Sequence, residues 1–130
     1  MSETILAPIA PGELIDKITI LRIKSERISD ETKLANVRIE LDVLNKTRAE
    51  AVEESAKLTE LDAALQAVNE ELWEIEDDIR DCERNGDFSD TFIQLARAVY
   101  VTNDKRAALK KEINLLLGSA IVEEKSYAEY

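Results

Sequence analysis

Histidine is absent from this 130-residue chain, and the residue types that build the commonest reactive sites are few. Without histidine, the chain lacks both the commonest general base and the commonest ligand of transition metals. Its single cysteine, Cys82, cannot form an internal disulfide, which fits a reducing compartment. There are only three glycines, and they form no glycine-rich phosphate-binding loop. Any catalysis would therefore depend on carboxylates, lysine, arginine or tyrosine.

Long apolar runs are also missing, and charge of one sign prevails. No apolar stretch approaches the roughly 20 residues of a membrane span, and no basic segment followed by a long apolar run opens the chain. We therefore expect a cytoplasmic protein that does not bind membranes. The 28 acidic and 17 basic residues give a net charge of −11, which repels nucleic-acid backbones. An acidic surface serves solubility by itself, or it indicates a cation, a basic protein or a partner helix.

Apolar residues recur at spacings of three and four, and this pattern predicts an all-α protein of one domain. Four helices are expected over about residues 13–27, 30–56, 59–84 and 89–117, between an extended arm over 1–12 and a tail over 118–130. Helix-capping residues support these limits, since Asp30 (or Ser29), Thr59 and Ser89 suit helix starts while Gly86 and Gly118 suit helix ends.

The two middle helices carry heptad-like apolar stripes. One stripe runs from Leu34 to Leu58 and the next from Leu58 to Cys82, three residues out of phase. This break predicts a turn at 56–59, and a stammer in one continuous helix is the alternative. With the turn, the helices form a long antiparallel, coiled-coil-like hairpin, on which the first and fourth helices pack. A monomer of this size cannot cover all these stripes, so we expect a homodimer.

Residues 69–83 combine an apolar stripe with eight carboxylates. Glu71, Glu74 and Asp77 follow one another at spacings of three, close enough on a helix to share a divalent cation. Such a cluster would suit a Mg²⁺-dependent phosphohydrolase. Glutamate-rich helices produce the same spacing on a solvated face, and no acidic pair from a facing helix is evident. We therefore expect no cofactor, with Mg²⁺ as the alternative.

Two polar residues, Thr102 and Arg106, interrupt the apolar stripe of the fourth helix. A buried guanidinium without a partner is unfavourable, so Arg106 should pair with a carboxylate of the third helix, Glu76 first and Asp77 second. The resulting layer either fixes the helix register or forms a ligand site. Its candidate residues are Asn69, Glu76, Asp77, Arg80, Asn103 and Arg106. Arg48, in a comparable position on the second helix, is expected to reach solvent.

Trp73, the only tryptophan, lies one position off the stripe of the third helix. It is therefore a candidate interface residue, either toward a neighbouring subunit or toward the N-terminal arm, and the monomer core is the other location open to it.

Three segments together, Pro11–Leu21, Asn69–Arg80 and Glu123–Tyr127, resemble a family of short bacterial proteins catalogued as a domain of unknown function. The resemblance covers almost the whole chain. It implies one complete domain in a bacterial cytoplasmic setting, and it implies no activity, ligand or catalytic residue.

The residue inventory favours a non-enzymatic function. The chain has no histidine, no phosphate loop and no nucleophile next to a base, so most catalytic arrangements are excluded. We expect a scaffold or accessory protein that acts through helix-mediated self-association and through binding of a protein partner. The alternative is the Mg²⁺-dependent phosphohydrolase described above.

Overall fold

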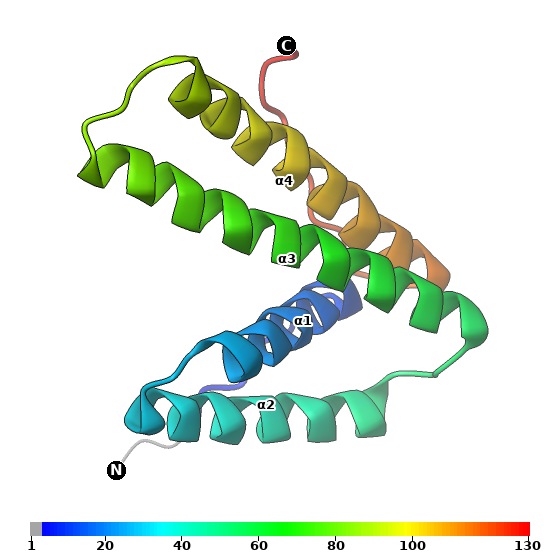
Figure 1. Ribbon diagram of the computed structural model, residues 1–130. Helices are drawn as coiled ribbons and strands as arrows, with labels where there is room; N and C mark the ends of the chain where they lie inside the picture. The colour runs from blue at the N-terminus through cyan, green and yellow to red at the C-terminus, as the bar shows by residue number, and fades with distance from the viewer. Residues whose placement is uncertain (1–3) are drawn as a thin grey trace.

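The structure, a computed structural model, describes residues 4–130 and contains four helices (Figure 1). These are α1 (Pro11–Arg27), α2 (Glu31–Ala51), α3 (Ala56–Arg84) and α4 (Asp90–Leu116). No strand occurs between residues 4 and 130, so the predicted all-α class is confirmed. The expected arm and tail have no regular secondary structure over residues 4–10 and 119–130, and residues 1–3 of the arm lie outside the described part.

The helix limits follow the capping residues more closely than the apolar pattern. Asp30 caps α2 as expected, since its side chain accepts a hydrogen bond from the Lys33 backbone N–H at 3.0 Å. Ser55, and not Thr59, caps α3 by accepting from the Leu58 N–H at 3.1 Å, so the turn lies at 52–55. Helix α1 begins at Pro11 because proline suits the first helical turn.

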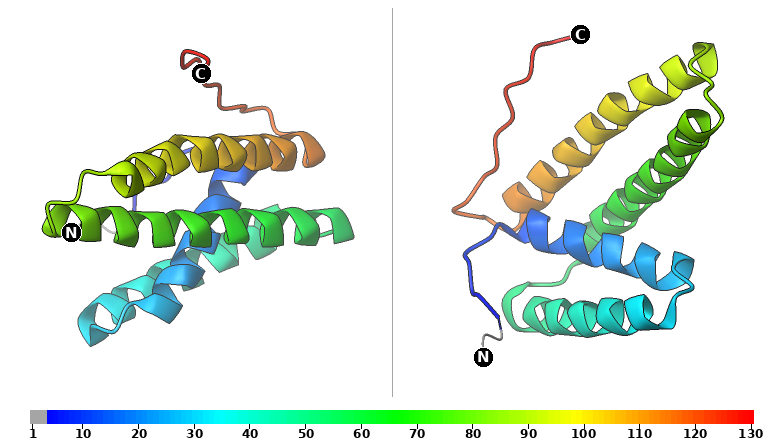
Figure 2. Two further views of the ribbon diagram at one scale, coloured as in Figure 1. Left: turned by 45° about the horizontal axis from the view of Figure 1, so that its top comes forward. Right: turned by 90° about the vertical axis from the view of Figure 1, so that its left-hand side faces the viewer.

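The helices pair differently from the prediction (Figures 1 and 2). Helix α3 packs along α4, α1 packs along α2, and α1 also contacts α3 and α4. Within residues 4–130, α2 and α3 do not pack on each other, so the predicted hairpin of these two helices is wrong. The reason is that the apolar stripe of α2, including the buried Leu34 and Val37, packs on α1.

Helix α1 is the central element, with α2 on one side and the α3–α4 pair on the other (Figure 2). Its Ile15 joins an apolar cluster with Leu58, Leu61 and Leu65 of α3 and Ile113 of α4. Because neighbouring helices cover α1 on several sides, two polar residues of this helix, Asp16 and Thr19, are also buried. They are the starting point of the candidate site.

Candidate functional site

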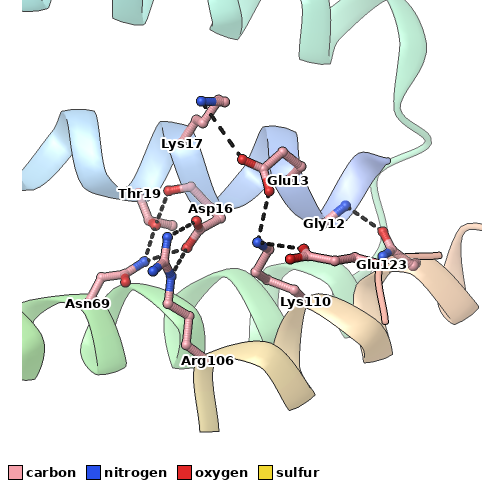
Figure 3. A network of polar contacts seen from close by, with 10 residues as sticks. Gly12, Glu13, Asp16, Lys17, Thr19, Asn69, Arg106, Lys110 and Glu123 are labelled. Atoms are coloured by element: carbon pink, nitrogen blue, oxygen red, sulfur yellow. Dashed lines mark hydrogen bonds and ion pairs between the residues drawn. The ribbon is translucent and has the colours of Figure 1, made fainter. Parts of the chain in front are cut away.

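Four side chains from three helices form a buried polar cluster, which consists of Asp16 and Thr19 of α1, Asn69 of α3 and Arg106 of α4 (Figure 3). Arg106 donates from Nε to Asp16 Oδ1 at 2.9 Å and from Nη2 to Asp16 Oδ2 at 2.5 Å. Asn69 Nδ2 donates to Asp16 Oδ1 and to Thr19 Oγ1, both at 2.9 Å. Both oxygens of Asp16, a residue with 1% exposure, are therefore occupied.

The polar cluster holds Asp16 in its charged form. Burial alone would raise the pKa of the Asp16 carboxyl, but the hydrogen bonds from Arg106 and Asn69 outweigh burial and bring this pKa below its ordinary value. The hydrogen bond to Asp16 in turn raises the pKa of Arg106. A carboxylate that is ionised and fully engaged is a poor general base, and its geometry instead ties three helices together.

A second set of contacts joins α1, α4 and the C-terminal tail (Figure 3). Lys110 Nζ donates to Glu13 Oε2 at 2.8 Å and to Glu123 Oε2 at 3.1 Å. Burial disfavours the Lys110 charge, yet these two carboxylates raise the pKa of Lys110 overall. The apolar side chains of the tail, Ile121, Val122 and Tyr127, are exposed. The tail is held by ionic contacts, because its acidic residues meet lysines of α4.

Arg106 is paired inside the protein as expected, but its partner is Asp16, and neither Glu76 nor Asp77. Glu76 and Asp77 are exposed, and Glu76 forms an ion pair with Arg80, one turn further along α3. Asp16 was missed in the sequence analysis because the partner of Arg106 was sought on the third helix, whereas Asp16 lies on the first. The available signal was the distribution of apolar residues over more than one face of α1, which indicates that polar residues of that helix can also lie near other helices.

All six predicted polar-layer residues nevertheless line one open hollow between α3 and α4, beside the polar cluster. Asn69 and Arg106 belong to both the cluster and the hollow, while Glu76, Asp77, Arg80 and Asn103 line the hollow only. Three further residues complete the lining: Ile20, Leu72 and Trp73. Trp73 is half-buried in this wall.

The predicted metal ligands Glu71, Glu74 and Asp77 are all exposed on α3. Glu74 Oε1 is 2.5 Å from Nη1 of Arg27 at the end of α1. Among residues 4–130, no group of three or more acidic or cysteine side chains is arranged to hold a metal ion. The described side chains therefore do not assemble these three carboxylates into a coordination site.

A second buried ionic network joins α1, α2 and α3. Arg48 Nη1 donates to Asp62 Oδ2 at 2.6 Å, and Arg22 Nη1 donates to Asp62 Oδ1 at 2.7 Å. Arg48 also binds both carboxylate oxygens of Glu54. Burial alone would raise the pKa of Asp62, but the two arginines bring it below its ordinary value. The expectation that Arg48 reaches solvent is wrong, because its side chain is only 12% exposed.

The fold and the polar cluster thus define an all-α protein whose central helix is fixed by buried ion pairs. The chain belongs to a family of unknown function (DUF6165), whose model matches residues 6–130. No curated protein and no solved structure matches the chain. Within residues 4–130, the structure contains no helix with the length and apolar character needed to cross a membrane.

Proposed function

We propose that this protein is a non-enzymatic scaffold or accessory protein that forms a homodimer through helix α2. The observation that carries the proposal is a second apolar face on α2. One face packs on α1, whereas Ile39 and Val43, four residues apart and so on one side of the helix, are 64% and 49% exposed. An apolar stripe on a helix with a free side is a common contact between subunits.

Charge supports α2 as the meeting surface. The chain has a net charge of −11, so two copies repel each other over most of their surface. Helix α3 contributes strongly to this repulsion, with ten acidic and three basic residues. Helix α2 has four acidic and four basic residues and is therefore neutral. Two copies can approach through α2 without the repulsion that an α3 contact would bring.

Twofold pairing places the same surface of each copy in the interface, and it is the commonest form of association. In such a dimer the two α3–α4 pairs would remain free on the outside, with their acidic surfaces open to a further protein. That arrangement suits an accessory protein whose central part is rigid and whose outer arms make contacts.

Light scattering tests the proposal. The wild-type protein should show about twice the chain mass of 14.7 kDa at micromolar concentration. Ile39→Glu or Val43→Glu should return it to the monomer mass, because each buries a charge in the interface. Ile93→Glu is the control, since Ile93 is an exposed apolar residue of α4 outside this surface. A monomeric wild-type protein at every concentration would refute the proposal.

A further inference from the structure

The hollow beside the polar cluster is about 540 Å³ in volume, large enough for a single aromatic or heteroaromatic ring. Asn69 of α3, Arg106 of α4 and Trp73 are among the residues that line it.

The orientation of the Asn69 amide is fixed by its neighbour. Asp16 is ionised and can only accept hydrogen bonds, so the amide nitrogen of Asn69 must face it. The amide oxygen is consequently turned away from Asp16 (Figure 3). Among residues 4–130 this oxygen has no hydrogen-bond donor, and it is not sealed from solvent, although Asn69 as a whole is only 5% exposed. It is a free acceptor on a residue that lines the hollow.

Arg106 supplies a free donor at the same place. Its Nε and Nη2 are engaged by Asp16, whereas Nη1 has no acceptor among the described residues. The side chain is 30% exposed, so this nitrogen can be reached from solvent. Asn103, three residues earlier on α4, is a half-buried lining residue, and its amide likewise has no hydrogen-bond partner within residues 4–130. The hollow therefore displays a donor and an acceptor from neighbouring helices, with a further amide near them.

The charges around the hollow exclude an anionic ligand. Arg80 is paired with Glu76, Arg106 is paired with Asp16, and Asp77 adds one negative charge that no ion pair balances among the described residues. Phosphate or carboxylate groups would be repelled here, and by the net charge of −11 as well. The indole of Trp73 and the aliphatic Ile20 and Leu72 provide apolar contact for a flat, uncharged molecule.

We propose that this hollow binds an uncharged planar lactam, a ring that presents an N–H and a C=O side by side on one edge. The ring N–H donates to Asn69 Oδ1, the ring C=O accepts from Arg106 Nη1, and the ring lies against Trp73. Asn103 contributes a further hydrogen bond to the ring. This assignment is independent of dimer formation through α2, which lies on the other side of α1.

Trp73 is the only tryptophan, so its fluorescence reports directly on the hollow. Uracil is the probe, because it has the required edge and no charge. It should change the emission in a saturable manner below about 10 mM, a concentration at which even weak sites fill. 1,3-Dimethyluracil, which has the same ring but no N–H, should bind at least about tenfold more weakly, since it leaves the Asn69 oxygen unpaired. Uridine monophosphate should also bind more weakly, because of its phosphate.

A pair of asparagine variants locates the site. Asn103→Ala should weaken uracil binding by about fivefold or more, the usual effect of one lost hydrogen bond. Asn45→Ala, the same change on the exposed surface of α2, should leave binding unaltered. No saturable response to uracil would overturn the proposal. Equal affinity for uracil and 1,3-dimethyluracil, or equal affinity in the two variants, would overturn it as well.

Discussion

Asn114 Oδ1 accepts a hydrogen bond from the backbone N–H of Gly12 at 2.7 Å, across 102 residues of sequence. This contact brings the first turn of α1 directly against the backbone of α4. A Cβ atom on residue 12 would lie 2.4 Å from the Lys110 carbonyl oxygen and 2.8 Å from Asn114 Oδ1. Glycine is therefore required at position 12 by close approach of two helices.

Gly12→Ala should lower the free energy of unfolding by about 3 kcal/mol, because the backbone of α4 cannot move aside as a flexible side chain would. Chemical denaturation measures the change. Gly86→Ala is the control: a Cβ there has no atom within 4 Å, and the positive φ of 66° alone should lower stability by about 1 kcal/mol. Equal losses in the two variants would show that α1 and α4 do not touch at Gly12.

Asp16→Asn should destabilise the protein by about 3–5 kcal/mol, because it leaves the partly buried Arg106 guanidinium without its counter-charge. Glu76→Gln is the matched control, since it neutralises the carboxylate that sequence reasoning assigned to Arg106. Glu76 is exposed, so its loss should change the free energy of unfolding by no more than about 0.5 kcal/mol. The reverse order of the two effects would contradict the observed pairing.

Stability should fall in acid. The pKa values of Asp16 and Asp62 are both lowered from the ordinary value of 3.8. The two carboxyl groups therefore bind protons less readily in the folded state than in the unfolded state. Their contribution to stability is complete above the unfolded pKa and is lost as the pH falls through the folded pKa. Urea unfolding should therefore give a constant free energy from pH 7 to about 5 and a decline below about 4. A decline already between pH 7 and 6 would assign the effect to other groups.

Arg48 and Asp62 should show strong energetic coupling. A double-mutant cycle of Arg48→Met and Asp62→Asn should give an interaction free energy of about 1–3 kcal/mol, because both side chains are nearly 90% buried. Lys57 and Glu60 form an exposed ion pair on the same helix as Asp62, and the same cycle there should give less than about 0.5 kcal/mol. Thermal or urea unfolding of the wild type and the six variants supplies both values, and similar couplings would refute the buried network.

Local sequence patterns were sufficient to predict the number of helices, and most helix ends lie within three residues of the prediction. Spacings of three and four, the cap at Asp30 and the glycines at 86 and 118 depend only on neighbouring residues. Gly86 and Gly118 have the positive φ angles expected of helix ends. The turn before α3 was predicted too late in the chain. The apolar stripe of the second helix continues in sequence to Leu58, one turn beyond Ser55, the residue that caps α3.

Helix pairing could not be predicted in this way. An apolar stripe shows which face of a helix is covered but not which helix covers it. The spacing of Leu34 and Val37 on α2 is equally compatible with packing on α1 or on α3, and in the structure α2 packs on α1. The same ambiguity misassigned Arg106: its position on an inward face was predicted correctly, whereas its partner Asp16 lies on a helix 90 residues away in sequence.

The central position of α1 also determines when the chain can fold during synthesis. Helix α1 leaves the ribosome first, but the guanidinium that neutralises its Asp16 arrives with α4, the last helix. Until then, burial of α1 would strand an ionised carboxylate in an apolar environment, which is strongly unfavourable. Stable burial of Asp16 therefore requires α4, so α1 can reach its final packed position only after α4 has left the ribosome. A chain that stops before α4 would lack the counter-charge of Asp16 and could not bury α1 in the same way.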